Sequence, residues 1–490
     1  MNKLFALLFC GVLIFHSINL SAQQIFSIED IIERTTSSSP YAKREETRKE
    51  NRYWQYRYFR TNYNPQLRLQ GSIPAYYKIV QQVPQPDGTF RYLSVEQTDN
   101  NLNLGLIQPI ALTGGTISAN TSLAYFKDFQ ALNEVLGEQW SGTVMNVALS
   151  QPIFSFNSLR WDRRTEPLRY EESKRDYVEQ MEFASRLAVE SFFNVLQQQV
   201  NLQIATFNLA NNDTIYKIEQ GRYNIGTTSL DKLLQVELQL LRSRQDVAQA
   251  NLDLQTARLQ LRTFIGLNDD DEFRLIMPEI IPLFDVSIDD ALMYAKQNRA
   301  AYIAFERRRL EAEREVAEAR GQRFQTTLTA AYGLNNNGLI MDDVYKNPTQ
   351  QQQFNLAISV PVLDWGRNKS RMQTAIANKK LNDYIIAQDE VNFEQEVVTQ
   401  VRQFEMLRLQ IEITKKSDEV AAERYNVAQN RYLIGKIDIT NLNIALTEKD
   451  AAKQSYIQAL KSFWIAYYEL RRLTLYDFAN KQLLYKPDNG

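Results

Sequence analysis

Apolar and polar positions alternate along several segments in the first third of the chain, a period typical of β-strands. From Gln66 onward, Leu67, Leu69, Ile73 and Ala75 fall on one face, and mostly polar residues fall on the other. The same alternation predicts further strands over 101–110, 117–125 and 143–153, with loops around 84–88, 113–115 and 133–142.

The second half shows the pattern only twice, over 324–334 and 353–362. Segments of about ten residues with one apolar face fit a barrel wall between lipid and water. A soluble sandwich shows the same alternation, so the strands alone leave both interpretations open. Aromatic residues near the strand ends resemble the belts found at membrane interfaces: Tyr76, Tyr77, Tyr125, Phe126, Trp140, Phe154, Tyr332, Phe354 and Trp365.

Most of the remaining chain has a helical period. These helices favour the barrel over the soluble sandwich. Residues 158–221 and 366–430 are nearly free of proline and glycine, and each predicts a helix of about 95 Å, far longer than helices of globular domains. Returning helices are predicted over 228–265 and 438–475, and shorter ones over 27–62 and 288–322. Their mixed apolar and charged faces suit coiled-coil-like layers.

The chain repeats itself. Arg222-Tyr223-Asn224-Ile225-Gly226 recurs as Arg431-Tyr432-Leu433-Ile434-Gly435, a shift of 209 positions. The same shift carries 151–154 onto 360–363, whereas Gln66 matches Gln325 at a shift of 259. Subtracting 209 from 259 leaves 50 extra residues in the first copy, with 84–125 as the best candidate. These residues predict an added hairpin, either in the barrel wall or at its outer end. A repeat implies that both copies do the same job.

Each repeated glycine lies between two predicted helices, so it marks a tight helix-turn-helix tip. Glycine adopts the left-handed conformation that ends a helix without a Cβ clash. Ser229 and Asp231 in the first copy, and Asp438 and Thr440 in the second, are candidate caps of the returning helix. Arg307-Arg308-Arg309 is interpreted as an exposed helix face.

The composition narrows the chemistry. Residues 1–22 have the basic start, apolar core and small final residue of a signal peptide. Its removal takes away Cys10 and His16, the only cysteine and histidine, so thiol and imidazole catalysis and the usual zinc sites are excluded. Without Lys3, 55 basic residues face 58 acidic ones, and a net charge of −3 argues against nucleic-acid binding. We expect no enzyme activity, cofactor or metal.

The chain resembles the TolC-type outer-membrane efflux proteins over essentially its whole mature length. The repeated Arg-Tyr-x-x-Gly motifs carry the resemblance, with Gln151-Pro152-Ile153-Phe154 and Val360-Pro361-Val362-Leu363-Asp364-Trp365-Gly366-Arg367-Asn368 at the strand-helix junctions. It implies an α+β membrane protein: a homotrimer with one shared transmembrane β-barrel and a long periplasmic α-helical barrel. It also implies an exit duct in the bacterial outer membrane, joined through a periplasmic adaptor to an inner-membrane transporter in a tripartite efflux or type I-like secretion system.

The resemblance also places candidate residues. The periplasmic tip, where adaptors dock in this family, would hold Arg222, Tyr223, Gly226, Thr227, Asp231, Arg431, Tyr432, Gly435 and Asp438. The strand-helix junctions would hold Pro152, Phe154, Pro361, Asp364, Trp365 and Gly366, with Asp364 capping the following helix. Family members often carry an acidic residue six positions after the tip glycine. This chain has Lys232 and Asn441 there, which puts an acidic gate in doubt.

The interpretation divides the chain into a signal peptide (1–22), a first repeat with the extra residues (23–267), a linker (268–287), a second repeat (288–480) and a tail (481–490). Two alternatives stay open. A soluble periplasmic coiled-coil adaptor or structural protein also has long helix hairpins, but should have one hairpin rather than two copies. A secreted hydrolase has only unplaced Asp and Glu residues to support it.

Overall fold

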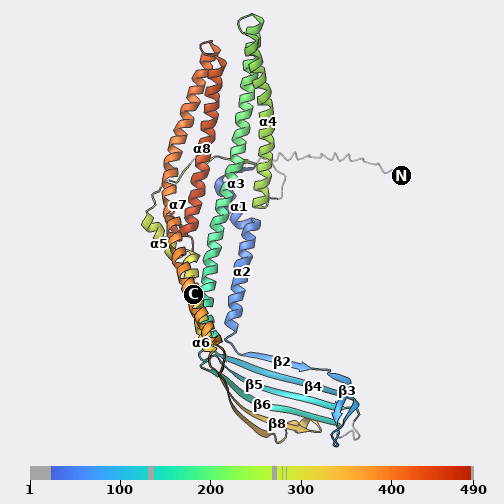
Figure 1. Ribbon diagram of the computed structural model, residues 1–490. Coiled ribbons are helices and arrows are strands. Elements are labelled where there is room, and N and C mark those ends of the chain that lie inside the picture. The colour runs from blue at the N-terminus through green and yellow to red at the C-terminus, as the bar shows by residue number, and fades with distance from the viewer. Residues whose placement is uncertain (1–23, 131–136, 268–272, 279, 283, 487–490) are drawn as a thin grey trace, which may run out of the picture.

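The computed structural model describes residues 24–130, 137–267, 273–278, 280–282 and 284–486, so the predicted signal peptide lies outside the described residues. The molecule is elongated. Two long helix hairpins lie side by side and end in neighbouring tips, and a curved sheet turns away from the helices at the opposite end (Figure 1).

The two repeats have helices of identical length. α1 (Ile28–Ser38) and α5 (Ile288–Asn298) each have 11 residues, and α2 (Pro40–Thr61) and α6 (Ala300–Gly321) each have 22. α3 (Ser158–Asn224) and α7 (Arg367–Leu433) each have 67, and α4 (Leu230–Ile265) and α8 (Ile439–Thr474) each have 36. The helical scaffold is therefore duplicated without insertion or deletion inside a helix.

The helices expected over 27–62 and 288–322 are each broken in two. Ser39 is extended (φ −66°, ψ 153°) and its side chain caps α2 by accepting from the Ala42 N–H at 3.0 Å. Pro40 lacks an N–H and disfavours a helical residue before it, which explains the break. Arg299 is extended at the matching point without a proline.

The main sheet is antiparallel throughout, in the order β2-β4-β5-β6-β8-β9 among the described residues. β3 continues the path of β2, because both pair with β4 one after the other. The 3₁₀ turn η1 (Met341–Tyr345) lies between β8 and β9. The strands are β2 (Gln66–Ser72), β3 (Tyr76–Pro84), β4 (Phe90–Ile110), β5 (Gly115–Asp128), β6 (Glu138–Ile153), β8 (Gln325–Gly338) and β9 (Thr349–Ser359).

The extra residues of the first repeat lie in the sheet. β2 with β3 corresponds to β8, and β6 corresponds to β9, so β4 and β5 are the added hairpin. β4 is twice as long as the strand predicted over 101–110, because residues 90–98 pair with β3.

Residues 268–287, expected as a linker, contain a strand. β7 (Phe273–Leu275) pairs in parallel with β1 (Gln24–Phe26), and Phe273 and Leu275 are buried. The expected tail is also attached: β11 (Gln482–Leu483) pairs with β10 (Tyr476–Asp477), and Tyr485 is buried with its hydroxyl 2.5 Å from Glu171 Oε1. Apolar side chains in these segments fix them to the helices.

The core lies where the helices meet, not in the sheet. Its largest buried side chains include Phe192 and Phe193 of α3, Phe404 of α7, and Phe463 of α8. Arg471 of α8 donates to Glu182 of α3 at 2.8 and 2.9 Å. The pKa of Glu182 is nevertheless raised by its burial, which Arg471 only partly offsets.

Candidate functional site: the hairpin tips and the channel wall

The two tips have the same backbone. Gly226 has φ +78° and its N–H donates to Tyr223 O at 2.9 Å, while Thr227 N–H donates to Arg222 O at 2.8 Å. Gly435 has φ +73° and the corresponding bonds to Tyr432 O and Arg431 O are 3.0 and 2.8 Å. This is a Schellman ending, in which the left-handed residue favours glycine. The repeated glycine therefore ends the helix through its φ angle.

The returning helices are capped by one residue in each copy. The Ser229 side chain accepts from Lys232 N–H at 3.4 Å, and Asp438 accepts from Asn441 N–H at 2.9 Å. Asp231 lies exposed in the first turn of α4 and does not cap it. Lys232 and Asn441 thus lie beside the caps.

A carboxylate that sequence reasoning missed joins the two tips. Glu219 of α3 is buried, accepts from the Tyr432 hydroxyl at 2.7 Å and pairs with Arg222 at 2.6 Å. The Arg222 guanidinium also lies 5.4 Å from the Tyr432 ring centre. We call Glu219, Arg222 and Tyr432 the tip cluster. No local sequence signal marks Glu219, because its partner is 213 positions away.

The tip cluster changes the acidity of its members. Burial and the neighbouring carboxylate raise the pKa of Tyr432. Burial opposes ionisation of Glu219, but hydrogen bonds from Tyr432 and Arg222 hold the pKa of Glu219 below its usual value. Near neutral pH, the Tyr432 hydroxyl is therefore a neutral donor and the Glu219 carboxylate is a charged acceptor.

The repeated tyrosines have different environments. Tyr432 is 2% exposed, whereas Tyr223 is 40% exposed. The position equivalent to Glu219 in the second copy, at a shift of 209, is Ala428, which offers Tyr223 no side-chain acceptor. Both copies thus have the same glycine turn, but only Tyr432 has a carboxylate partner.

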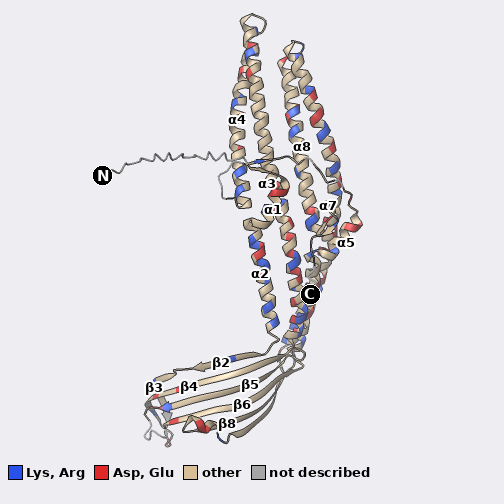
Figure 2. Cartoon of the chain, turned by 180° about the vertical axis from the view of Figure 1, so that it is seen from behind, with Lys and Arg blue, Asp and Glu red and all other residues tan. Residues whose placement is uncertain are grey.

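The sheet has one apolar and one polar face, because directly paired residues share a face. Leu106 pairs with Leu67 and Ala119, and Val147 pairs with Ala119 and Tyr332. On the other face, Asn120 pairs with Gly105 and Asn146, and the Asn146 amide donates to Asn120 at 3.0 Å. Lys, Arg, Asp and Glu concentrate along the helices and are sparse on the sheet (Figure 2).

Exposed apolar side chains follow the first face from β2 to β9: Leu67, Leu69, Leu102, Leu104, Leu106, Val147, Tyr332, Phe354, Leu356 and Ile358. At its outer end, the rings of Tyr125 and Trp140 lie 4.7 Å apart. A sheet that is apolar outside and polar inside is the pattern of a membrane barrel with a water-filled interior.

The strand-helix junctions expose aromatic side chains on unusual backbone. Phe154 (φ +58°) is 83% exposed, and Trp365 (φ +52°) is 90% exposed. Pro152 pairs with Thr327, one residue before the pairing of β6 with β8 ends at Ile153 and Thr326. Pro361 follows β9 and is exposed. A left-handed backbone at a bulky residue is uncommon, and such strain often occurs at functional positions.

Asp364 lies at the start of α7. It accepts from the N–H groups of Gly366 and Asn368, both at 3.0 Å. These bonds lower the pKa of Asp364. Gly366 has φ +85°, so the turn before α7 also requires a left-handed residue.

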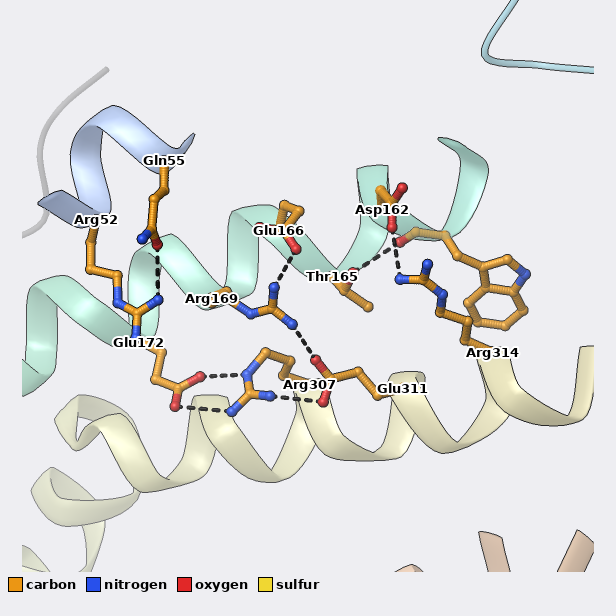
Figure 3. A network of polar contacts seen from close by, with 11 residues as sticks. Arg52, Gln55, Asp162, Thr165, Glu166, Arg169, Glu172, Arg307, Glu311 and Arg314 are labelled. Atoms are coloured by element: carbon orange, nitrogen blue, oxygen red, sulfur yellow. Dashed lines mark hydrogen bonds and ion pairs between the residues drawn. The ribbon is translucent and has the colours of Figure 1, made fainter. Parts of the chain in front are cut away.

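The three consecutive arginines form only partly an exposed face, which corrects that expectation: Arg309 is exposed, whereas Arg307 and Arg308 are half-buried. Arg307 of α6 donates to Glu172 of α3 at 2.6 and 3.1 Å and to Glu311 at 2.8 Å (Figure 3). Arg308 and Arg309 reach Asp389 and Glu390 of α7 at 2.8 and 2.7 Å. Apart from Glu311, which is four residues away on α6, the acidic partners lie on α3 and α7, so the local sequence did not reveal them.

Among the described residues, no helix combines the length and apolar character needed to cross a bilayer. Within the same part of the chain, no group of three or more acidic, histidine or cysteine side chains is placed to hold a metal ion.

The model of the outer membrane efflux protein family matches residues 130–267 and 292–474, which is more than half of the chain. The chain belongs to the outer membrane efflux protein family. Its members are channels of the bacterial outer membrane, not enzymes, and their long helices form a periplasmic extension. The family membership identifies the sheet as the β-barrel part and the hairpins as the helical part.

Solved structures share the fold at low identity. The CmeC outer membrane channel of Campylobacter jejuni has a TM-score of 0.66 and 14% identity, covering 94% of this chain and 87% of CmeC. The outer membrane protein VceC of Vibrio cholerae has a TM-score of 0.62 and 15% identity, and the match covers 91% of this chain and 95% of VceC. The open state of the Neisseria gonorrhoeae MtrE channel has a TM-score of 0.60 and 16% identity, and the match covers 91% of this chain and 88% of MtrE. No curated protein sequence matches the chain.

Proposed function

We propose that the protein is a homotrimeric exit duct of a tripartite efflux or type I-like secretion system. One observation supports the trimer. The repeat partners of the elements that join the two repeats inside one protomer lie on the flanks of that protomer, where a second copy could make the same contacts. Within the protomer, β6 pairs with β8, α3 packs on α6, and α3 packs on α8. We call this set of contacts the inner seam.

The duplication predicts a second seam. Replacing each element by its repeat partner turns the inner seam into β9 with β2, α7 with α2, and α7 with α4 of the next protomer. We call this the outer seam. All its elements lie on the flanks of the protomer with free surfaces, so a second copy of this chain fits them.

The helices of the outer seam carry apolar stripes that nothing in the protomer covers. On α4, Leu234, Leu238, Leu241, Leu252 and Leu259 are each at least half exposed. On α7, Met406, Leu409, Ile413, Val420 and Val427 are exposed to the same degree, at spacings of three, four and seven. Such spacing is that of a coiled-coil seam, so we infer that α4 and α7 of neighbouring protomers pack together.

The helices near the sheet also expose apolar side chains on the flanks of the protomer. Trp54 and Tyr58 of α2 are exposed, as are Leu381 and Tyr384 of α7. The equivalent inner contact is α3 with α6, which the Arg307 network holds (Figure 3). Aromatic and leucine side chains would replace ion pairs in the outer seam.

The register of the outer sheet contact follows from the inner one. Ser150 pairs with Thr329, and Leu149 pairs with Ala330. Shifting β6 by 209 and β8 by 259 predicts that Ser359 pairs with Gln70 of the next protomer, and Ile358 with Gly71. These pairs keep apolar residues on the apolar face, so both faces continue across the boundary.

The tips are proposed as the docking site of a periplasmic adaptor that connects to an inner-membrane transporter. The proposed docking residues are Arg222, Tyr223, Gly226, Thr227, Asp231, Arg431, Tyr432, Gly435 and Asp438. Opening would separate the tips, after which cargo diffuses through a water-filled interior. The existence of an open state among the fold's solved structures supports a mouth that changes shape.

Cysteine cross-linking tests the trimer, because the mature chain after residue 22 contains no cysteine. We expect Gln70→Cys with Ser359→Cys to give a disulfide-linked trimer in outer membranes under oxidising conditions. The control Arg68→Cys with Ala357→Cys is four residues out of register and should stay unlinked. Linkage of the control pair alone, or a monomer in detergent, would contradict the proposal.

Arg431→Glu tests adaptor docking. Arg431 is exposed at the tip, whereas Arg222 is held by Glu219. We expect the charge reversal to reduce efflux and adaptor co-purification at an unchanged trimer level. Loss of the trimer would instead make Arg431 structural.

A further inference from the structure

We propose that the β4–β5 hairpin makes the membrane barrel of the trimer eighteen-stranded, where the duplicated strands alone would give twelve. This inference rests on the homotrimer proposed above. Each protomer contributes six strand positions among the described residues, and three protomers of six strands give eighteen.

The hairpin is an addition to a four-stranded plan. The second repeat supplies one hairpin, β8–β9, while the first supplies β2 with β3, β4, β5 and β6. The helices of the two repeats have equal lengths, so the 50 residues that separate the two shifts are confined to the sheet. The helical tunnel keeps the plan of the duplication while the barrel does not.

The turn of the hairpin is fixed at the helical end of the sheet. The Asn157 amide, at the start of α3, donates to Ala111 O at 3.0 Å and Leu112 O at 3.2 Å. Thr113 donates to Gln151 at 2.7 Å, and Gln108 donates to Tyr63 O, just after α2, at 3.0 Å. Gly114 (φ +78°) is required here, because a Cβ would also meet the Asn157 side chain at 3.0 Å.

The hairpin is long enough to span the membrane from this end. β4 and β5 pair over fourteen positions, from Ile110–Gly115 to Gln97–Asp128. A tilted membrane strand needs about 9–11 residues. The hairpin therefore runs the full height of the wall and is not a cap over its outer end.

The hairpin also has the two faces of the wall. Leu102, Leu104 and Leu106 lie on the apolar face, and Asn103 pairs with Gln70 and Ser122 on the polar face. A hairpin folded into the lumen would not need an exposed leucine row. The pattern fits lipid on one side and water on the other.

Adding two strands, an even number, still allows the sheets of the three protomers to close into one barrel. An insertion of two antiparallel strands leaves β2 and β9 running in opposite directions, so β9 still meets the next protomer's β2 in antiparallel pairing. One added strand would have broken this alternation. The added width lies in the barrel, so the helical tunnel and its mouth limit the size of the cargo.

Distances across the trimer test the strand number. With strands about 4.8 Å apart and tilted by roughly 40°, equivalent Cα atoms in the three protomers lie roughly 30 Å apart for eighteen strands and roughly 20 Å for twelve. A spin label at Ala148→Cys, on β6, reports this distance by pulsed electron resonance in the detergent-solubilised full-length trimer. The reach of the label shortens both values alike.

The outcomes separate the two proposals. A separation roughly 10 Å longer than the twelve-strand value supports the inference, and the twelve-strand value within an intact trimer overturns it. Absence of dipolar coupling together with a monomeric mass overturns the trimer itself.

A matched pair of cysteine variants tests the hairpin independently of width. Asn103→Cys and Leu104→Cys are adjacent on β4 but lie on opposite faces. We expect a water-soluble thiol reagent to modify Asn103→Cys, and a bimane label at Leu104→Cys to be quenched by brominated lipid. Water access at both positions, or no quenching at Leu104→Cys, would remove the hairpin from the wall.

Discussion

The inner seam and the proposed outer seam use the same elements with different side chains. The inner seam is polar near the sheet, where Arg307 binds Glu172 and Glu311. At the tip, a further contact between the two repeats closes it, because Tyr432 of α7 donates to Glu219 of α3. The outer seam presents a leucine stripe on α4 and a mixed aliphatic stripe on α7, and Ala428 occupies the position equivalent to Glu219. We therefore expect the tip cluster to hold the two hairpins of one protomer together, whereas the outer seam has no matching carboxylate at the tip.

The largest expected effect comes from breaking the outer seam. Ile413→Asp should abolish the trimer, because each of three seams would bury an unpaired carboxylate at a cost of several kcal/mol. The detergent-solubilised mass should fall to that of a monomer. Lys415→Asp, on another side of α7, should leave the trimer intact, and a stable Ile413→Asp trimer would exclude α7 from the interface.

Removing the tip carboxylate should open the inner seam. Glu219→Ala leaves the buried Tyr432 hydroxyl and Arg222 without their acceptor, a loss of about 3 kcal/mol. We expect higher conductance in planar bilayers at an unchanged trimer mass. Gln220→Ala, the exposed neighbour, is the control, and equal conductance in both variants would show that the tip cluster does not hold the mouth.

The repeated tyrosines should respond unequally. Tyr432→Phe removes a hydrogen bond to a charged group, worth about 1.5 kcal/mol, so the open fraction should rise about tenfold. Tyr223→Phe should change it less than about twofold, because Tyr223 is exposed and faces no equivalent carboxylate. Equal responses would contradict the difference between the seams.

The smallest expected effect is on pH dependence. The lowered pKa of Glu219 stabilises the closed tip above the unfolded pKa of Glu, and this contribution is lost as the pH falls through the folded pKa. The raised pKa of Tyr432 acts in the opposite sense: its contribution is present below the unfolded pKa of Tyr and lost as the pH rises through the folded pKa. Conductance should therefore be lowest between about pH 5 and pH 9. Glu219→Gln should remove the acid-side rise.

Local patterns predicted the fold to a large extent. Alternation located β2, β5, β8, β9 and residues 143–153 of β6, although β6 begins at Glu138 inside the expected loop. The absence of proline and glycine located α3 and α7. The break at Ser39 had a readable signal in Pro40, while the break at Arg299 had none. The pairing of residues 90–98 with β3 could not be predicted, because it depends on which strand lies beside β4.

The sequence by itself determined the duplication, the tip glycines and the two-faced strands. These follow from backbone conformation and from the period of side chains along one element, which are local properties. The tertiary structure decided which copy of a repeated residue is buried, that Glu172 pairs with Arg307, and that the extra residues join the sheet. These outcomes depend on partners more than a hundred positions away, or on the neighbour in the sheet, and a linear pattern does not encode such distances.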